Sequence, residues 1–447
     1  MRACLLKLLN DPDLSKHLAT LGRNMPAHAL VSYTHTLPNQ RNDWLNYLPA
    51  NAPYWYHARP ERSEYCLGLG HALHLVSDGP ARFRALASAH QGLAEHWQQD
   101  GLPPRLFTGF AFAPNNSQPL NNALLAVPAL LLQSREGRCT ATVTAPLASI
   151  AEQAPGWPGL VGDSHPLPQC TLPKHAPQLA EQAWQARVNA ALREIAKGHV
   201  QKLVLSRSHE IHAEHPLWHP GRVAGTLARL CQQQPESLIY AHGEGPKVFL
   251  GATPERLVAL HGGQISADAL AGTAWSGSPA LGNAKNHHEQ ALVVTAIDAA
   301  LTPLSTGPVN IEAAREHNLA QLRHLRSRIR AHARPKTRLF DLVAALHPTP
   351  AIGGFPAEAA LHWLLAHGEQ RHGWYAGGFG LLEANGDGDI AVALRSALIT
   401  GPRVLLQAGA GIVSGSRPEE ELAETEAKLQ TMRQALEMET IRHPLQA

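Results

Sequence analysis

The fold is decided by a stretch near the C-terminus, Gln407-Ala-Gly-Ala-Gly-Ile-Val-Ser-Gly-Ser-Arg-Pro-Glu-Glu-Glu-Leu-Ala-Glu-Thr-Glu-Ala-Lys428. Gly409 and Gly411 have no Cβ, so the backbone there can approach an anion closely. Taken alone, the stretch also fits a glycine-rich turn before a solvated, charged helix. The rest of the chain has to decide between these two interpretations.

The helix predicted after these glycines has a charged face. Pro418 suits the first helical position, and the acidic residues that favour a helix N-terminus follow it directly: Glu419, Glu420 and Glu421. Glu421, Glu424 and Lys428 recur at spacings of three and four, so they share one side of the helix. The spacing therefore predicts two carboxylates and an ammonium group close together.

Length and composition are those of a globular protein. The chain has 447 residues, enough to bury a large core in two or three domains or one large one. Apolar residues make up 44% and the formal net charge is +2, which argues against a nucleic-acid-binding surface and against disorder. The 27 histidines are scattered without a repeated metal-ligand spacing, which favours ordinary surface positions.

The cysteines and the N-terminus indicate a reducing compartment. The five cysteines are far apart and form no CxxC pair, which argues against a disulfide scaffold and a zinc site. The N-terminus lacks the hydrophobic region and cleavage site of a signal peptide. No stretch reaches the roughly 18 apolar residues of a membrane span. We therefore expect a soluble, cytoplasmic protein with no membrane or nucleic-acid partner.

The first half of the chain is predicted to be rich in strands. After about 50 residues of loops and short helices, strand-like runs cover 54–59, 65–70, 106–112, 123–133 and 138–144. One amphipathic helix is predicted over 80–98. A proline-rich segment at 151–177 then predicts a linker between an N-terminal half, 1–150, and a C-terminal region, 178–440.

The C-terminal region opens with a helix predicted over 178–197, which Gly198 ends. Residues 201–207 are predicted to form a strand. Its alternation divides the side chains between two faces, with Lys202, Val204 and Ser206 on one and Leu203, Leu205 and Arg207 on the other.

Further strands are predicted at 238–241, 247–251, 256–261 and 264–267, and helices at 287–301 and 318–331. A hairpin with arms 373–382 and 389–399 is predicted to turn on 385–388. The strands come as adjacent hairpins rather than in alternation with helices. We therefore expect an α+β fold with largely antiparallel sheets, not a doubly wound fold.

Three short motifs fail to complete a known site. Asn385-Gly-Asp-Gly-Asp389 imitates a calcium loop, but the twelfth position holds Ser396 instead of glutamate. His288-Glu289 begins like HExxH, but Leu292 stands where the second histidine belongs. Residues 243–247 lack the frame of a phosphate-binding loop.

Four ionisable residues lie where secondary structure alone does not favour them. Lys202 and Arg395 interrupt apolar strands, and Glu255 follows a strand directly. Glu289 lies in a helix just before an apolar run. Each fits an ordinary strand edge or helix surface, but a buried charge must be paired or must bind a ligand. If these residues converge, they form a charged pocket.

The order of motifs resembles one family, the chorismate-utilising enzymes, which comprise isochorismate, salicylate, anthranilate and aminodeoxychorismate synthases. The resemblance covers about 178–436, over half of the chain, and rests on eight motifs in this order: QKLVLSR, FLGATPERL, ALAGT, AKNHHEQALVV, LHPTPAIGG, GWYAGGFG, VALRSALI and AGAGIVSGSRPEEELAETEAKL. Each motif alone is weak, whereas eight in this order are very specific. The stretches YWYHARPE and TGFAF are similar to the family's N-terminal half.

The resemblance implies a fold of two largely antiparallel β-sheets packed face to face with helices outside, an α/β/β/α sandwich. In that fold, 1–150 completes the sandwich and 178–440 is the chorismate-binding catalytic region. Between LAGT and KNHHE the chain has only 274–284, which is shorter than the family usually shows. That segment flanks the implied pocket.

The resemblance also implies catalytic roles. Lys202 matches the general base that activates water in isochorismate and salicylate synthases, and Glu255 matches the general acid that protonates the departing C4 hydroxyl. Within the substrate-binding run Leu270, Ala271, Gly272 and Thr273, Ala271 replaces the nucleophilic lysine of aminodeoxychorismate synthases. Ala351 lies near the incoming nucleophile in the branch that uses water.

A magnesium site and a carboxylate-binding site follow from the same resemblance. Glu289 and Glu424 match the two Mg²⁺-binding glutamates, with support expected from Glu421 and His288. The residues that match substrate carboxylate binding are Tyr375, Arg395 and Lys428, together with the backbone N–H groups of Gly409, Ala410 and Gly411. Glu419, Glu420 and Glu426 are then left as solvated acids.

The function that the resemblance implies is Mg²⁺-dependent isomerisation of chorismate to isochorismate. Two alternatives stay open: a salicylate synthase, which then eliminates pyruvate, and a non-catalytic binding protein that kept the fold. We expect no obligatory amidotransferase subunit, and either a monomer or a homodimer. The sequence does not distinguish menaquinone biosynthesis from siderophore biosynthesis.

Overall fold

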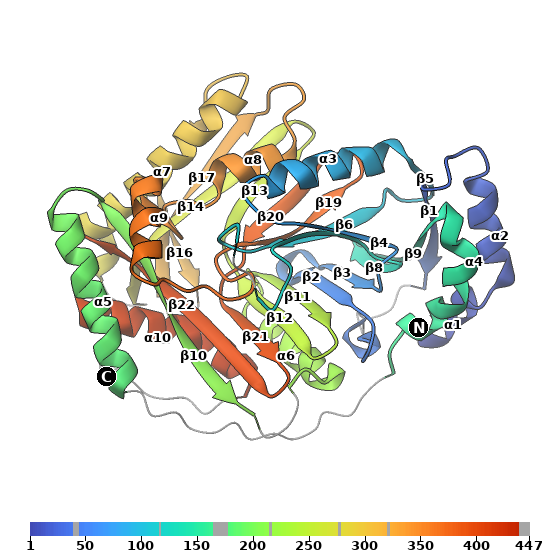
Figure 1. The fold of residues 1–447 in the computed structure, drawn as a ribbon, viewed down its shortest axis with the longest axis horizontal. Helices are drawn as coiled ribbons and strands as arrows, with labels where there is room; N and C mark the ends of the chain where they lie inside the picture. The colour runs from blue at the N-terminus through green and yellow to red at the C-terminus, as the bar shows by residue number, and fades with distance from the viewer. Residues whose placement is uncertain are drawn as a thin grey trace.

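The computed structural model describes residues 1–38, 44–115, 118–163, 178–213, 217–275, 279–319 and 322–437. These residues form two large β-sheets that pack face to face and carry helices on their outer faces (Figure 1). The expected α/β/β/α sandwich is confirmed. None of the helices in this described part combines the length and apolar character of a bilayer-spanning segment.

The first sheet has twelve strands. In spatial order they are β18 (Gly354–Phe355), β10 (Lys202–His212), β22 (Arg403–Val413), β21 (Ser396–Thr400), β12 (Lys247–Thr253), β11 (Leu238–Glu244), β2 (Tyr54–Arg59), β3 (Glu64–Leu69), β8 (Leu130–Arg135), β9 (Arg138–Pro146), β1 (Leu30–Leu37) and β5 (Trp97–Asp100). Among these described strands only β1 and β5 pair in parallel, so the expected antiparallel character is confirmed.

The second sheet has ten strands. In spatial order they are β15 (Asn310–Ile311), β17 (Leu322–His332), β14 (Gln264–Trp275), β13 (Arg256–His261), β20 (Gly388–Val392), β19 (Gly378–Glu383), β6 (Arg105–Phe110), β7 (Ala123–Val127) and β4 (Leu73–Ser77), with β16 (Arg315–Leu319) paired to β17. Early and late strands meet within both sheets, at β2–β11 and at β6–β19. The linker at 151–177 stays a prediction, and 164–177 lies outside the described residues.

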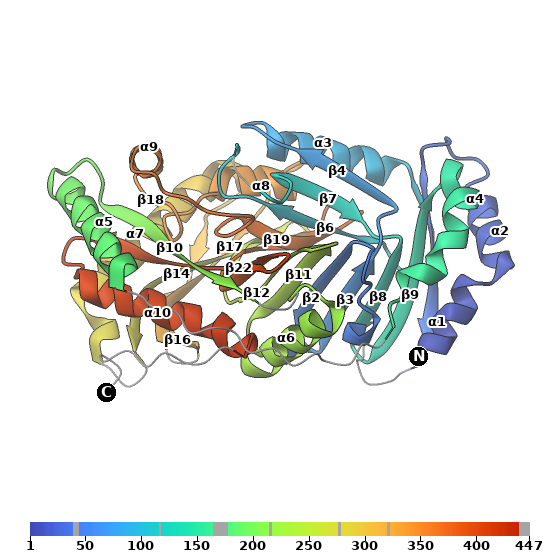
Figure 2. The same ribbon diagram turned by 60° about the horizontal axis from the view of Figure 1, so that its bottom comes forward.

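The helices cover the two outer faces (Figure 2). On the twelve-stranded sheet lie α5 (Gln178–Ala196), α6 (Pro220–Gln233), α9 (Ala357–Ala366) and α10 (Pro418–Ala435), and α1 (Arg2–Leu9), α2 (Pro12–Leu21) and α4 (Ile150–Gln153) pack near β1 and β9. On the ten-stranded sheet lie α3 (Arg82–Glu95), α7 (Ala284–Leu301) and α8 (Leu339–Leu346). Between the sheets, aromatic side chains from both form a continuous core, including Trp55, Phe107, Phe249, Trp374 and Phe379.

The helix predicted over 318–331 is wrong, because the described residues of this segment, 318–319 and 322–331, belong to β16 and β17. From Leu325 onward, buried side chains alternate with arginines at 326, 328 and 330. A period of two is typical of a half-buried strand. The helix propensity of the arginines contributes less free energy than burying one face of the strand, so the segment forms a strand.

Two predicted strands are each divided between the sheets. The segment 123–133 becomes β7 in one sheet and β8 in the other, with Pro128 between them. The second hairpin arm, 389–399, becomes β20 and β21. Arg395 lies between them, so its predicted place within a strand is wrong. Its φ of 51° is in the left-handed region, where the chain crosses from one sheet to the other.

Residues 407–415 are also arranged differently from the glycine-rich turn that the sequence alone permits. Residues 407–413 are the end of β22, and the turn comes only at 414–415. Pro418 is the first residue of α10, with the three glutamates in its first turn, as predicted. The glycines are therefore strand residues, and their lack of side chains acts on the face of a sheet rather than in a turn.

Candidate functional site

A pocket opens between the two sheets where β10, β22, α7 and α10 approach β13 and β14. Nearly all the predicted site residues line it: Glu255, Leu270, Ala271, Gly272, Thr273, Glu289, Ala351, Tyr375, Arg395, Gly409, Gly411, Glu424 and Lys428. The side chain of Ala410 faces the other way and packs among apolar residues under α5 and α9. Lys202 lies in the wall behind Gly411.

Lys202 is the first residue of β10, and its side chain is buried, with 1% exposed. Its Nζ lies 2.8 Å from Oε1 of Glu289 on α7. Alternation along β10 puts Leu203 and Leu205 against the helices on the outer face, so Lys202 and Val204 face inward, as predicted. A buried ammonium group requires such a partner.

Gly411 makes room for this ion pair. A Cβ built on Gly411 would lie 2.3 Å from Oε1 of Glu289 and 2.8 Å from Cε of Lys202. Real side chains do not tolerate such distances, so any larger residue would displace one of the two partners. The glycine is needed here because two charged side chains cross directly above the strand.

A second ion pair lies on α10. Lys428 Nζ donates to Oε1 of Glu424 at 2.6 Å and to the carbonyl of Gly409 at 2.8 Å. Burial raises the pKa of Glu424, but the charge and hydrogen bond of Lys428, with Lys285 and Thr273, outweigh burial and leave the pKa below its ordinary value. Glu424 is therefore ionised at neutral pH.

Glu421, one turn earlier, pairs with Lys285 at 2.6 Å. Burial, followed by the neighbouring charge of Glu424, raises the pKa of Glu421 to about 7. The charges of Glu421, Glu424 and Glu289 together raise the pKa of Lys285 against the effect of burial. His288 is exposed, and among the described residues no hydrogen bond or ion pair joins it to a glutamate, so its expected support is absent.

The pair Glu289 and Glu424 meets the requirements of a magnesium site in its donor chemistry. Both carboxylates line one pocket, and Mg²⁺ prefers one or two carboxylates with substrate and water oxygens over a full protein cage. In the described part of the chain, no three histidine, cysteine or acidic side chains are grouped as metal ligands. Each glutamate has an oxygen on a lysine here, so a metal ion and the ammonium groups would compete for the same carboxylates.

Glu255 lies on the opposite wall, just before β13, and is 5% exposed. Its backbone is fixed by hydrogen bonds from Val392 N to its carbonyl and from its own N–H to Thr253. Burial raises the pKa of its carboxyl to about 8, against the opposing charges of Lys202, Lys428 and Arg395. Glu255 also borders a second cavity, of about 300 Å³, whose lining includes six arginines.

A hydrogen-bond chain crosses the pocket from Arg395 to Glu424. Burial and the charges of Arg395 and Lys428 lower the pKa of His324 well below its ordinary value, so the ring is neutral. Arg395 Nη2 lies 3.5 Å from Nε2 of His324, so this nitrogen accepts the hydrogen bond. The Nδ1–H of His324 then faces Thr273 Oγ1 at 3.2 Å. Thr273 Oγ1 donates to Glu424 Oε1 at 3.2 Å.

Arg395 and Tyr375 supply the pocket with a cation and a hydroxyl. Burial lowers the pKa of Arg395 to about 10, with Glu424 acting against this effect, so the guanidinium stays charged at neutral pH. Burial raises the pKa of Tyr375, so its phenol stays protonated. Arg395 is presented by the strained crossing between β20 and β21, and its carbonyl accepts from Ala252 N at 3.2 Å.

Sequence reasoning missed several residues around this pocket: Lys285, His324, Arg371 and Gln407. Lys285 lies in the quoted AKNHHE motif, but its partner is on another helix, which no local pattern shows. His324 was hidden by the wrong helix over 318–331. The alternation of arginines in that segment was the signal for a strand, and with the strand His324 would have faced the pocket.

Glu426 corrects a second expectation, since it is not a solvated acid. Its carboxylate forms close ion pairs with Arg207 on β10 and Arg433 on α10. The side chain of Glu426 is 13% exposed. Arg207 therefore lies on the outer face of β10, opposite Lys202, as predicted. Glu419 and Glu420 are exposed, as expected.

The structure describes residues 274–275 and 279–284 of the short segment 274–284. β14 continues to Trp275, and a short 3₁₀ turn at Pro279–Gly282 leads to Asn283, whose side chain accepts from Asn286 N at the start of α7. Residues 276–278 lie outside the described residues.

Comparison with known proteins gives the site its context. A family model described as chorismate binding enzyme matches residues 16–437. A salicylate biosynthesis isochorismate synthase from Pseudomonas aeruginosa is 34% identical over 412 residues, which are 86% of this chain and 85% of that protein. The isochorismate synthase MenF from Escherichia coli is 30% identical over 381 residues, which are 80% and 84% of the two chains.

The fold is similar to that of a solved relative. The structure of MenF, the menaquinone-specific isochorismate synthase from Escherichia coli, matches with a TM-score of 0.80 at 26% identity, and the match covers 97% of this chain and 99% of that one. The same two antiparallel-rich sheets therefore underlie both proteins. By its sequence, its fold and the family model that spans nearly all of its length, this chain belongs to the chorismate binding enzyme family.

Proposed function

We propose that this protein is an isochorismate synthase, an isomerase that converts chorismate to isochorismate in the presence of Mg²⁺. The observation that carries the proposal is the pocket itself, where a protonated carboxyl, Glu255, faces two lysine-paired carboxylates, Glu289 and Glu424. The isochorismate synthases among its relatives support the reaction class.

The charges of the pocket suit an anionic substrate. Chorismate is a dianion, and the guanidinium of Arg395, the ammonium of Lys428 and the phenol of Tyr375 offer donors to its carboxylates. The walls that flank them are small or apolar, including Leu270, Ala271 and Ala351. Such a lining orients a ring without competing for its polar groups.

Magnesium would be held by Glu289 and Glu424. Bound there, the ion would neutralise a substrate carboxylate and draw electron density from the ring as a Lewis acid. The protein side chains then have two tasks, which are to position the substrate and to move protons.

The proton transfers fall to Lys202 and Glu255. Lys202, acting as the general base, takes a proton from the water whose oxygen forms a bond to C2 of the substrate. The ring double bonds shift, the bond from C4 to its hydroxyl breaks, and that hydroxyl takes the proton of Glu255 and leaves as water. One water enters and one leaves, so the product is an isomer of the substrate. A positioned acid or base of this kind typically contributes about 10²–10⁴-fold in rate.

The test is turnover by the pure protein. Incubated with chorismate and Mg²⁺, the wild type should form isochorismate, and Lys202→Ala should not. Absence of isochorismate with the wild type would overturn the proposal. Release of salicylate and pyruvate without a second enzyme would instead identify a salicylate synthase.

A further inference from the structure

The strand that carries Lys202 has an open edge. On one side β10 pairs with β22 from Lys202 to His212. On the other side β18 pairs only with Lys202 and Leu203. Beyond this point, on the same edge, the buried residues Val204 and Ser206 have no neighbouring strand among the described residues. The N–H of Val204 donates to the carbonyl of Gly353 at 3.0 Å, which leaves the Val204 carbonyl and both backbone groups of Ser206. Such groups require other partners.

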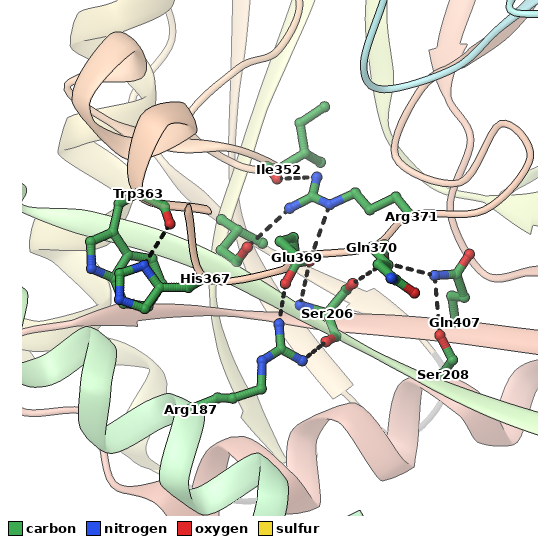
Figure 3. A network of polar contacts seen from close by, with 11 residues as sticks. Arg187, Ser206, Ser208, Ile352, Trp363, His367, Glu369, Gln370, Arg371 and Gln407 are labelled. Carbon is green, nitrogen blue, oxygen red and sulfur yellow. Dashed lines mark hydrogen bonds and ion pairs between the residues drawn. The ribbon is translucent and has the colours of Figure 1, made fainter. Parts of the chain in front are cut away.

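Side chains take the place of the missing strand (Figure 3). Ser206 N donates to Oε1 of Glu369 at 2.9 Å, and the carbonyl of Ser206 accepts from Arg187 Nη1 at 2.8 Å. The carbonyl of Val204 accepts from Arg371 Nη2 at 2.9 Å. Three charged side chains thus continue the hydrogen bonding of the sheet along the strand of Lys202.

The three side chains are also bonded to one another. Glu369 forms a close ion pair with Arg187 on α5, and its Oε1 accepts from Arg371 Nε at 3.3 Å. The side chains of Glu369 and Arg371 are each 4% exposed. At such burial, removing the carboxylate would leave Arg371 without its counter-charge, and a buried charge pair is costly to break from one side.

Arg371 extends this network to the pocket. It lines the pocket, and its Nη1 donates to the carbonyl of Ile352 at 2.6 Å, next to Ala351. Its guanidinium lies 3.7 Å from the centre of the Phe112 ring. One rigid guanidinium therefore ties the strand of Lys202 to the loop of Ala351, and none of its observed bonds leads into the pocket.

The segment of Glu369 and Arg371 is in turn fixed to β22. Gln407 Oε1 accepts from His372 N at 3.0 Å, and its Nε2 lies 3.4 Å from the carbonyl of Gln370 and 3.3 Å from Ser208 Oγ (Figure 3). The network therefore has attachments on α5, β10, β22 and the loop at 352.

We propose that Glu369 and Arg371 are positioning residues for the reaction, which hold Lys202 at a fixed distance from the water-binding side of the pocket beside Ala351. This inference rests on the proposed function. Neither residue is assigned a contact with the substrate. They act through the backbone of Val204, Ser206 and Ile352, which sets where the Lys202 ammonium and the Ala351 wall lie.

The test compares two buried glutamates that contact β10 at different places. Glu369 lies at the edge of the strand, and Glu426 lies on its outer face. Glu369→Ala removes the network, whereas Glu426→Ala removes the ion pair with Arg207 on the outer face. Both variants are expected to lower thermal stability. Only Glu369→Ala should lower kcat, by about 10–100-fold, since a misplacement of about 1 Å costs up to 10²-fold. KM for chorismate should change little, and Glu369→Gln, which keeps an acceptor oxygen, should recover part of kcat.

Amide hydrogen exchange supplies a readout that does not depend on turnover. Glu369→Ala should speed exchange at the Ser206 amide, which donates to Glu369, while Glu426→Ala should leave this amide protected. Equal losses of kcat in the two variants, or unchanged exchange at Ser206 in Glu369→Ala, would overturn the positioning role. A wild type that does not turn over chorismate would contradict the proposed function, whereas unchanged exchange at Ser206 beside an active wild type would contradict the positioning role alone.

Discussion

Glu424 on α10 and Glu255 before β13 line the same pocket, but their surroundings differ. Glu424 accepts from Lys428 at 2.6 Å and from Thr273 at 3.2 Å, and its pKa lies below the ordinary value. Glu255 is just as enclosed, yet among the described residues no ion pair or side-chain hydrogen bond reaches its carboxyl. Burial then raises its pKa to about 8.

The difference shows that burial raises the pKa of an enclosed carboxyl when no partner is present, whereas at Glu424 the charge and hydrogen bond of Lys428 outweigh burial. At neutral pH the wall at Glu424 is anionic and suited to a cation, whereas Glu255 is mostly protonated and suited to donate a proton. One residue type thus supplies two kinds of chemistry. Both carboxyl groups line the same pocket.

The largest loss of turnover is expected on the side of the pocket where glutamates pair with lysines, because Lys202, the proposed base, lies there. Lys202→Ala should lower kcat by about 10⁴-fold, the upper range for a lost general base. Mg²⁺ binding, measured by calorimetry, should be retained because Glu289 loses only a competing ammonium group. Lys197→Ala, which changes an exposed lysine, serves as the control. Turnover by Lys202→Ala like that of the wild type would remove Lys202 from the mechanism.

Glu255→Gln tests the other side of the pocket, where the carboxyl of Glu255 is proposed to donate a proton. The variant should lower kcat by about 10²–10³-fold at pH 7. In the wild type kcat/KM should fall as the pH rises through about 8, because the acid of the free enzyme is then ionised. A wild-type profile with no change near pH 8 would show that the proton comes from another group.

The same group predicts a change in stability with pH. A carboxyl whose pKa is raised on folding contributes stability below its unfolded value near 4.5, and this contribution is lost as the pH rises through about 8. Thermal unfolding of the wild type should therefore show a loss of stability over this range. Glu255→Gln should reduce that loss.

The metal dependence separates the two walls again. Chelation should abolish turnover, and Glu424→Gln should weaken Mg²⁺ binding by at least about tenfold, the effect of losing even an indirect contact to a metal. Glu255→Gln should leave Mg²⁺ binding unchanged. Equal losses of Mg²⁺ affinity in both variants, measured by calorimetry, would contradict the division of roles.

Gly411→Ala should have a smaller effect, because it shifts the lysine-paired side of the pocket without removing a charge. The added methyl would lie 2.3 Å from Glu289 Oε1, so the Lys202–Glu289 pair must move. We expect kcat/KM to fall by about 10-fold, less than the ~10² of a full 1 Å displacement. Gly415→Ala, at a turn glycine with open space around it, is the control for glycine loss, although its φ of 86° adds backbone strain.

The smallest effect on turnover is expected at Glu426, a paired glutamate of α10 that faces away from the pocket. Glu426→Ala should lower the free energy of unfolding by about 3 kcal/mol, since it leaves two arginines without their partner. Turnover at a temperature where the variant is folded should match the wild type. A large loss of kcat would extend the catalytic region to the outer face of β10.

Much of the site could be predicted because short motifs carry it. The strand with Lys202, the helix with Glu289 and the helix from Pro418 are where local patterns place them. Glu426 was misjudged because a helix face shows which residues are neighbours on that helix but not what packs against it. Arg207 lies more than 200 residues earlier in the chain.

The division of strands between two sheets could not be predicted from periodicity. Residues 389–399 are apolar apart from Asp389, Arg395 and Ser396, so the pattern does not show that the chain leaves one sheet and enters the other at Arg395. The crossing depends on a left-handed backbone at an arginine, which only tertiary contacts can stabilise. The sequence marks Arg395 as unusual, whereas its geometry needs the whole sandwich.

The side chains along β10 also affect how the protein behaves in a crowded solution. An unpaired strand edge offers N–H and C=O groups to which another chain can add, and this is a common route to aggregation. Arg187, Glu369 and Arg371 occupy those groups at Val204 and Ser206 with charged atoms that cannot extend a sheet. At Val204 and Ser206 the edge of β10 therefore presents guanidinium and carboxylate groups, and another strand cannot pair with these backbone groups.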